Sequence, residues 1–323
     1  MNHFTDEAAS RVREALFHPL GGELGKALRD KTVEEIRANP DGKIWIVSKE
    51  RGTYDTGETI TPQKAESVLR LMADASKSLV TDETPTVSGE LPGNGERFQG
   101  VFPPVSRAAF FVIRKPAETV YTLDDYVTMG AATPQQIATI RRIIAPPSPK
   151  NILVIGGTFT GKTTFGNALL SEPAYINDRC AVLEDTRELN FSGLDVVDMR
   201  TYEPFVGMDA LVKVSLRLSP RRLILGEVRD KAAWSLLQAW NTGHMGGFAT
   251  LHANDCASAL TRIEDLVGEV AVRVPHASII SAIGAIIQIK FNEHGQRVIG
   301  SVAEVTGYNH DKREYELNEL LAA

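Results

Sequence analysis

Residues 151–164, NILVIGGTFTGKTT, join a short apolar run to three glycines and a lysine. A glycine, four residues and then Gly-Lys-Thr is the spacing of a phosphate-binding loop. Glycines let successive backbone N–H groups face a phosphate, and the N-terminus of a following helix adds partial positive charge. The residues predicted to contact a nucleotide are Gly156, Gly157, Thr158, Phe159, Thr160, Gly161, Lys162, Thr163 and Thr164. Lys162 is expected to reach the terminal phosphates and Thr163 to bind Mg²⁺.

Hydrolysis of a nucleotide needs carboxylates to support the metal and to position water. Two acidic clusters further along the chain, each at the end of an apolar run, could supply them. The first is Leu183-Glu184-Asp185-Thr-Arg187-Glu188, and the second ends the run Arg222-Leu-Ile-Leu-Gly-Glu227-Val-Arg229. Strand ends line the ligand crevice of an open α/β sheet. We therefore expect both clusters to face the nucleotide.

A third cluster, Gly243-His244-Met-Gly-Gly-Phe-Ala-Thr-Leu-His252-Ala-Asn254, sets three glycines and two histidines around a short apolar strand. Such a backbone can approach a ligand closely. Its spacing matches no zinc pattern and no cysteine pair accompanies it. A phosphate-sensing or hydrogen-bonding role is favoured over metal binding, and a purely structural turn stays open.

The elements that must position these residues alternate between strand and helix from residue 151 onward, which predicts a mostly parallel sheet with helices on both faces. In order they are ILVI, a helix over Lys162–Leu170, AVLE, a helix near Asp209–Leu216, RLILG, a helix near Ala232–Trp240, and GFATL. Short strands are expected from 288 to 320, around a turn at His294-Gly295.

The first third of the chain has a different, α+β pattern. Its expected elements are a helix over Asp6–Phe17, a strand at KIWIVSK, a helix opened by Thr61-Pro62, a loop over Glu83–Glu96, and strands at RFQGVF and AAFFVIRK. A capping box at Thr133-Pro-Gln-Gln136 opens a further helix that ends at a proline-rich exit. These patterns predict an N-terminal α+β domain (1–116), a linker with a helix (117–150) and a C-terminal α/β domain (151–323).

The net charge, the cysteine count and the length of the apolar stretches limit the classes of protein to which the chain can belong. The 323 residues carry a net charge of −6, which repels polyphosphate at long range and argues against stable direct DNA binding. Only two cysteines occur, Cys180 and Cys256, so a disulfide framework is not expected. The N-terminus lacks a signal-peptide pattern, and the longest apolar stretch, 277–289, is too short to span a bilayer. We expect any membrane association to be peripheral.

Four ordered stretches, GGTFTGKTT, LEDTREL, LILGEVRD and GHMGGFATLHAN, together resemble the Walker A, Asp box, Walker B and His box of the secretion-superfamily traffic ATPases. VEEIRANPDGKIWI and RFQGVFPPVSRAAFFVIRKP are similar to the N-terminal domain of that family. The nearest branch is that of the conjugal-transfer ATPases of type IV secretion. The resemblance implies a hexameric ring of two-domain subunits, with ATP between the N-terminal domain and a RecA-like C-terminal domain.

The resemblance also implies roles for individual residues. Lys162 and Thr163 would hold phosphate and Mg²⁺, and Glu184 and Glu227 would support the metal and activate water, without a choice between the two. Arg97 and Arg114 would offer guanidinium groups to the phosphates. An arginine finger acting on a neighbouring subunit would come from Arg217, Arg221 or Arg222, with Arg217 included among the candidate catalytic residues. His244 and His252 would relay between phosphate and subunit interface, while Phe159, Thr160 and Met245 depart from the usual motifs.

The function predicted is that of an Mg²⁺-dependent ATPase motor. It would power channel or pilus assembly, or substrate transfer, in a conjugative type IV secretion system. The expected location is the cytoplasm, peripherally on the inner membrane, with inner-membrane components of the secretion machine as partners. The alternatives are a nucleotide-gated scaffold with little turnover, a small-molecule kinase and a DNA translocase. A GTPase switch is disfavoured because the chain has no Asn-Lys-x-Asp motif.

Overall fold

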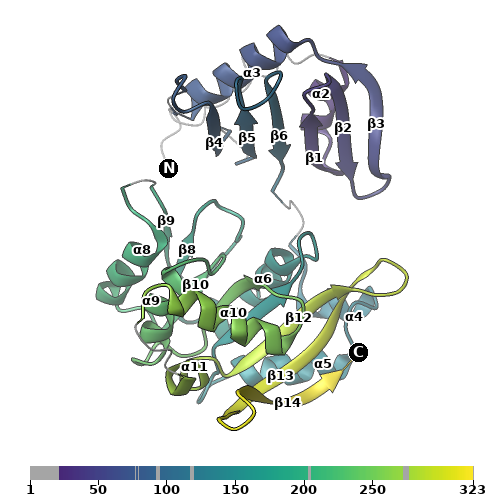
Figure 1. Ribbon diagram of the computed structural model, residues 1–323. Helices are drawn as coiled ribbons and strands as arrows, with labels where there is room; N and C mark the ends of the chain where they lie inside the picture. Colours follow the sequence, from purple (N-terminus) through teal and green to yellow (C-terminus); the bar gives the residue numbers. More distant parts are fainter. Residues whose placement is uncertain are drawn as a thin grey trace. The chain divides into compact units, whose positions relative to one another are not determined.

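The structure is a computed structural model of the chain, shown in Figure 1. It describes residues 22–76, 78, 80–91, 95–116, 120–202, 205–271 and 276–322. The chain divides into two compact units, Met1–Glu118 and Thr119–Ala323. The helix expected over Asp6–Phe17 lies outside the described residues. Each unit is considered by itself.

The first unit contains one antiparallel sheet of six strands, in the order β3-β2-β1-β6-β5-β4. The strands are β1 (Val33–Ala38), β2 (Lys43–Ser48), β3 (Gly52–Thr59), β4 (Thr86–Glu90), β5 (Arg97–Val101) and β6 (Phe110–Arg114). Its helices are α2 (Gly22–Arg29) and α3 (Pro62–Ala75). The expected cap of α3 is confirmed, because the Thr61 side chain accepts a hydrogen bond from the backbone of Lys64.

One face of this sheet packs against both helices. Ile36, Ile46 and Phe111 of the sheet share a core with Leu28 of α2 and Leu69 of α3. Side chains on successive residues of a strand point to opposite faces, so the neighbouring positions occupy the other face.

The prediction of a loop over residues 83–96 is wrong in part, because Thr86–Glu90 form β4. Strand β4 pairs with β5 along its whole length, and this tertiary pairing overrides a composition typical of loops.

The second unit contains a mixed sheet of eight strands, in the order β14-β13-β12-β7-β11-β10-β8-β9. The strands are β7 (Ile152–Gly156), β8 (Arg179–Glu184), β9 (Asp195–Arg200), β10 (Arg222–Leu225), β11 (Phe248–His252), β12 (Ala285–Phe291), β13 (Arg297–Asn309) and β14 (Glu314–Ala322). The run from β12 to β9 is parallel, and β13 and β14 are antiparallel to their neighbours. The sheet is therefore parallel at its centre and mixed at one edge.

Helices cover both faces of this sheet. They are α4 (Leu123–Thr128), α5 (Pro134–Ile144), α6 (Lys162–Leu170), α7 (Pro173–Ile176), α8 (Met208–Ser215), α9 (Ala232–Trp240), α10 (Cys256–Gly268) and α11 (His276–Ala282). Strand β7 shows the division: Leu153 and Ile155 join a core with α8 to α11, whereas Ile152 and Val154 join a core with α4 to α7. A strand buried on both faces explains the uninterrupted apolar run ILVI.

The predicted linker segment, 117–150, carries α4 and α5, and both pack into the second unit. The predicted capping box of α5 is confirmed, since the Thr133 side chain accepts from the backbone of Gln136 and the Gln136 side chain accepts from that of Thr133. The helices expected over Lys162–Leu170 and Ala232–Trp240 have those bounds in the structure, and the helix near Asp209 spans Met208–Ser215.

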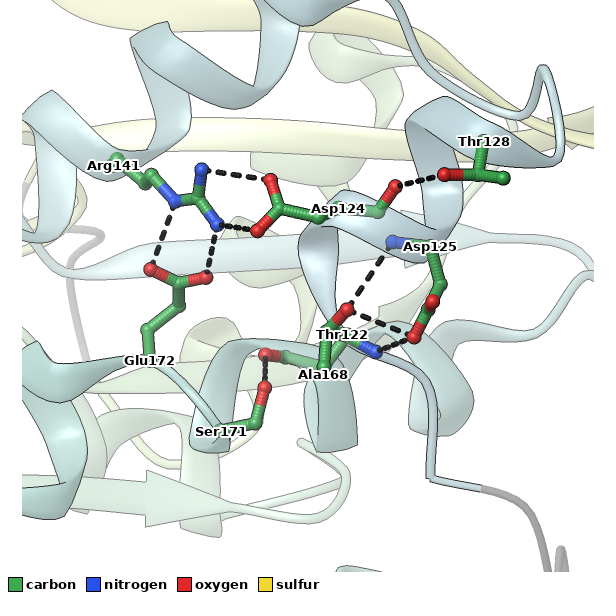
Figure 2. A network of polar contacts seen from close by, with 8 residues as sticks. All are labelled: Thr122, Asp124, Asp125, Thr128, Arg141, Ala168, Ser171 and Glu172. Atoms are coloured by element: carbon green, nitrogen blue, oxygen red, sulfur yellow. Dashed lines mark hydrogen bonds and ion pairs between the residues drawn. The ribbon is translucent and has the colours of Figure 1, made fainter.

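An arginine ties α4 and α5 to the segment that follows α6, as Figure 2 shows. The Arg141 guanidinium donates to both carboxylate oxygens of Glu172, at 3.0 and 2.9 Å, and to both of Asp124, at 3.0 and 2.9 Å. Glu172 is buried, whereas Asp124 is exposed. The helix that starts at the phosphate-binding loop is thereby held from its far end. Across the described ranges, no helix is both long and apolar enough to cross a lipid bilayer.

Candidate nucleotide-binding site

The predicted phosphate-binding loop lies between β7 and α6, as its spacing requires. Gly161 precedes α6 with φ of 95°, a backbone region that residues with a Cβ atom rarely adopt, and no side chain caps the helix. A Cβ atom on Gly156 would stand 2.3 Å from the carbonyl oxygen of Ile289, so this position also requires glycine. The uncapped N–H groups of α6 and the glycine backbone form a cradle suited to an anion.

Lys162 is buried at the first turn of α6, with 8% of its surface exposed. Its Nζ donates to the carbonyl oxygens of Gly156 at 3.0 Å and Gly157 at 2.9 Å, and lies 3.3 Å from Nδ1 of His252. Burial lowers the pKa of Lys162 from its usual value, while Glu227 and Glu188 oppose this change. The ammonium group thus lies inside the loop, where an incoming phosphate can replace the two carbonyl oxygens.

The two glutamates of the first acidic cluster have different environments. Glu188 accepts a hydrogen bond at 3.1 Å from the hydroxyl of Thr163, the residue predicted to bind Mg²⁺. Glu184 is 5% exposed, and its Oε1 accepts from the backbone N–H groups of Glu188 at 2.9 Å and Leu189 at 2.8 Å. Burial raises the pKa of Glu184 to about 7, against the opposing effect of those two hydrogen bonds. Glu184 shapes the loop, and that loop presents Glu188 to Thr163.

Glu188 lies within this motif but is not among the predicted site residues, because the strand pattern gives no information on how the loop turns after Glu184. Asn167 completes the turn, since its amide donates to the Glu188 carbonyl and accepts from the backbone of Asn190. Asn167 itself, a polar residue on the buried side of α6 five positions after Lys162, was the feature of the sequence that could have indicated this turn.

Glu227 follows β10 and lies on the other side of Lys162. Its Oε1 is 3.7 Å from Nε2 of His252, and its Oε2 accepts a hydrogen bond from Arg229. Burial pushes the pKa of Glu227 upward, but Arg229, His252 and Lys162 together bring it below its usual value. Burial and the Lys162 charge lower the pKa of His252, against the pull of Glu227. At neutral pH the site therefore holds an ionised Glu227 beside a neutral His252.

The structure brings His252 to the loop but not His244. His252 ends β11 and pairs with Gly156 of β7, where the phosphate-binding loop begins. His244 precedes β11, so a strand of about 16 Å separates the two histidines. His244 lies instead against the Pro220 carbonyl oxygen, 2.8 Å from its Nδ1. Within one chain, His244 therefore lies beyond the amino-terminal end of β11, whereas the loop lies at the carboxyl end.

The three candidate arginine fingers also lie toward the amino-terminal ends of the strands, Arg217 and Arg221 before β10 and Arg222 at its first residue. Arg222 is 1% exposed and donates to Asp178, to the Gly246 carbonyl and to the Ile144 carbonyl, so it is fixed inside the fold. Arg221 is exposed and lies 3.2 Å from Asp178. Arg217 is exposed in the short 3-10 helix η1 (Leu216–Leu218). Only Arg217 and Arg221 can extend from the surface.

The predicted phosphate-binding arginines of the first unit, Arg97 and Arg114, occupy opposing positions on β5 and β6. Arg114 also lies opposite Glu35 of β1 and donates to its carboxylate at 2.9 and 3.1 Å. Arg37 donates to the other oxygen of the same buried carboxylate. These side chains are on the face of the sheet that α2 and α3 leave open.

The side chains around Thr163 fit a magnesium ion held mainly by substrate. Oxygen donors from a hydroxyl and carboxylates suit Mg²⁺, which usually takes only one or two protein carboxylates and completes its shell with water and phosphate oxygens. Thr163 and Glu188 supply such oxygens. Within the described part of the chain, no three His, Cys, Asp or Glu side chains gather into a ready-made metal cage.

Comparisons with known proteins agree with these features. Residues 24–298 match the family model described as "Type II/IV secretion system protein". The chain is 41% identical to the "Conjugal transfer protein TrbB" of Rhizobium radiobacter over 94% of both proteins. It is 30% identical to the "Type IV secretion system protein PtlH" of Bordetella pertussis, covering 80% of this chain and 83% of that one.

Among solved structures, the chain resembles the "Crystal Structure of the Pilus Retraction Motor PilT and Bound ADP", with a TM-score of 0.61 and 19% identity. This match covers 92% of this chain and 82% of that one, and it bears on the fold alone. The family match and the curated relatives confirm the resemblance inferred from the four motifs.

Proposed function

Because the chain belongs to the type II/IV secretion system protein family, we propose that it is the ATP-hydrolysing motor of a conjugative type IV secretion system. One observation carries the proposal: Lys162, Thr163, Glu188, Glu227 and His252 meet at the uncapped N-terminus of α6. A site that only bound nucleotide would not need acidic groups on both sides of the lysine. The similarity to the conjugal transfer protein supports the choice of conjugation.

The roles within the site follow from its geometry. Lys162 and the backbone N–H groups from Gly156 to Thr164 bind the phosphates of ATP in this RecA-like domain. Thr163 and Glu188 would hold Mg²⁺, which would supply positive charge beside the phosphates. Glu227, kept ionised by Arg229, orients the attacking water, and His252 connects Glu227 to Lys162. Glu184 acts on catalysis only through the loop that it shapes.

We further propose that the active form is a ring of copies, six by the family resemblance. Arg217, Arg221 and His244 lie in the segments that precede β10 and β11, at the ends of these strands away from their own phosphate-binding loop. They can approach a nucleotide only if it is bound by another copy. Arg217 is our candidate for the group that stabilises charge there. Arg97 and Arg114 remain predictions for phosphate contact from the first unit.

The partners that we propose are inner-membrane components of the secretion machine, with the motor peripheral on the cytoplasmic face. The net charge of −6 supports contact with proteins over stable contact with DNA.

A mixing experiment tests the motor and its ring together. K162A lacks the phosphate-binding lysine but keeps Arg217, whereas R217A keeps the loop. Each variant alone should release little phosphate from ATP. An equimolar mixture should regain a substantial fraction of wild-type activity, because mixed rings pair an intact loop with an intact arginine. The double variant K162A/R217A is the matched control: mixed with R217A it supplies no Arg217 to any intact loop, so that mixture should gain nothing.

A mixture no more active than its components would contradict the role of Arg217 between copies. A wild-type protein that binds ATP and assembles without releasing phosphate would favour the nucleotide-gated scaffold instead.

A further inference from the structure

The turn between β12 and β13 brings Arg297 to the phosphate-binding loop. Arg297 Nε donates to the carbonyl oxygen of Phe159 at 3.0 Å, although 138 residues separate the two in sequence. No motif in the sequence analysis included Arg297. Its position at the start of β13, two residues after the His294-Gly295 turn, places it beside the loop in space.

Phe159 occupies an unusual backbone conformation. Its φ is 64°, in the left-handed region that residues with a Cβ atom disfavour. Its side chain is 43% exposed, so burial of the ring does not explain why this conformation is kept. A phenylalanine held there requires support from its surroundings. The hydrogen bond from Arg297 is a direct source of that support.

Arg297 also lies against the other end of the loop. A Cβ atom on Gly161 would stand 3.4 Å from Cδ of Arg297, so the aliphatic part of this side chain passes beside the N-cap of α6. At the start of the loop, the backbone of Ile289 in β12 approaches Gly156 more closely still, because a Cβ atom there would stand 2.3 Å from the Ile289 carbonyl oxygen. The β12–β13 hairpin therefore borders the phosphate-binding loop from its first glycine to its last.

We propose that Arg297 is a positioning residue for nucleotide binding, which holds Phe159 in its left-handed conformation so that the loop N–H groups converge before the phosphates arrive. This inference rests on the proposed function, because it concerns the same loop. A loop ordered in advance costs less free energy to order when the ligand binds. Without Arg297, the Phe159 backbone relaxes toward negative φ and the phosphates must reorder it.

The test is ATP affinity, measured by isothermal titration calorimetry on the full chain without turnover in the presence of EDTA. R297M should weaken binding about ten-fold, since it removes a hydrogen bond from a charged donor. R297K keeps a donor and should recover part of this loss. R313M removes an arginine from the exposed turn between β13 and β14, and it should bind within about two-fold of wild type.

A double-mutant cycle with F159G distinguishes positioning from direct contact. Glycine adopts a φ of 64° readily, so the loop needs less support in this background. R297M should therefore weaken ATP binding clearly less in the F159G protein than in wild type. An equal loss in both backgrounds would mean that Arg297 contacts the nucleotide itself, and would overturn the proposal.

Unchanged affinity in R297M would overturn it as well. A wild-type protein that binds no ATP would contradict the proposed function instead. Circular dichroism of each variant confirms that the fold is intact before affinities are compared.

Discussion

The substitution Glu184→Gln tests whether the Glu184 carboxylate shapes the site or takes part in the chemistry. Both backbone donors, Glu188 and Leu189, reach the same oxygen of Glu184, and the amide oxygen of glutamine can accept both. The substitution therefore keeps the loop and removes only the buried charge. We expect E184Q to be more stable than wild type at alkaline pH and to retain phosphate release within about three-fold.

The magnitude follows from the pKa. Burial raises the pKa of Glu184 to about 7 in the folded protein, from an ordinary value of 4.5. The folded state thus binds the proton more tightly than the unfolded state, and stability falls as the pH rises from about 4.5 to about 7. At about 1.4 kcal/mol per pH unit, the full cost of ionisation is about 3 kcal/mol. Between pH 5 and pH 8, the advantage of E184Q should grow by about 2.5 kcal/mol.

Urea unfolding followed by tryptophan fluorescence measures this difference. In a W45F background the remaining tryptophans, Trp234 and Trp240, both lie on α9 and report on the second unit. E293Q changes an exposed carboxylate in the β12–β13 turn and is the matched control, with no expected pH-dependent gain. A stability difference that stays constant with pH, or a large loss of phosphate release in E184Q, would refute the assignment of Glu184 as a residue that shapes the loop.

Two further substitutions test neighbouring contacts. E188Q should lower phosphate release about 100-fold while ATP still binds, because the carboxylate beside Thr163 supports the developing charge; a rate near that of wild type would exclude Glu188 from this role. R141M should destabilise the second unit by about 2 kcal/mol, because it leaves the buried Glu172 carboxylate without its cation. D124N removes only the exposed partner of Arg141 and should cost under about 1 kcal/mol. Equal losses in a urea titration of these last two variants would contradict the structure's distinction between the buried and exposed carboxylates.

Local patterns in the sequence predicted the elements that depend on neighbouring residues. The phosphate-binding loop, α6 and the capping box of α5 follow from residues within a few positions of one another, and the structure has them where expected. The strand β4 was missed because its residues join a sheet only through pairing with β5. Its threonine, serine and glycine content is equally typical of a loop.

The candidate site was harder to predict because it depends on which end of a strand faces the nucleotide. His244 and His252 flank the same strand, and only the residue at its carboxyl end reaches the loop. The direction of parallel strands was available from the alternating pattern and could have separated the two histidines. The burial of Arg222 could not be foreseen, since its acceptors come from Asp178, Ile144 and Gly246, all remote in sequence.

Phosphate release from ATP is the measurement that tests the central claim most directly. The wild-type chain should release phosphate in a reaction that requires Mg²⁺ and stops with EDTA. K162A should release it only at the background rate, because the ammonium group inside the loop is lost. Hydrolysis by K162A at the wild-type rate would contradict the assignment of this loop as the site of ATP hydrolysis.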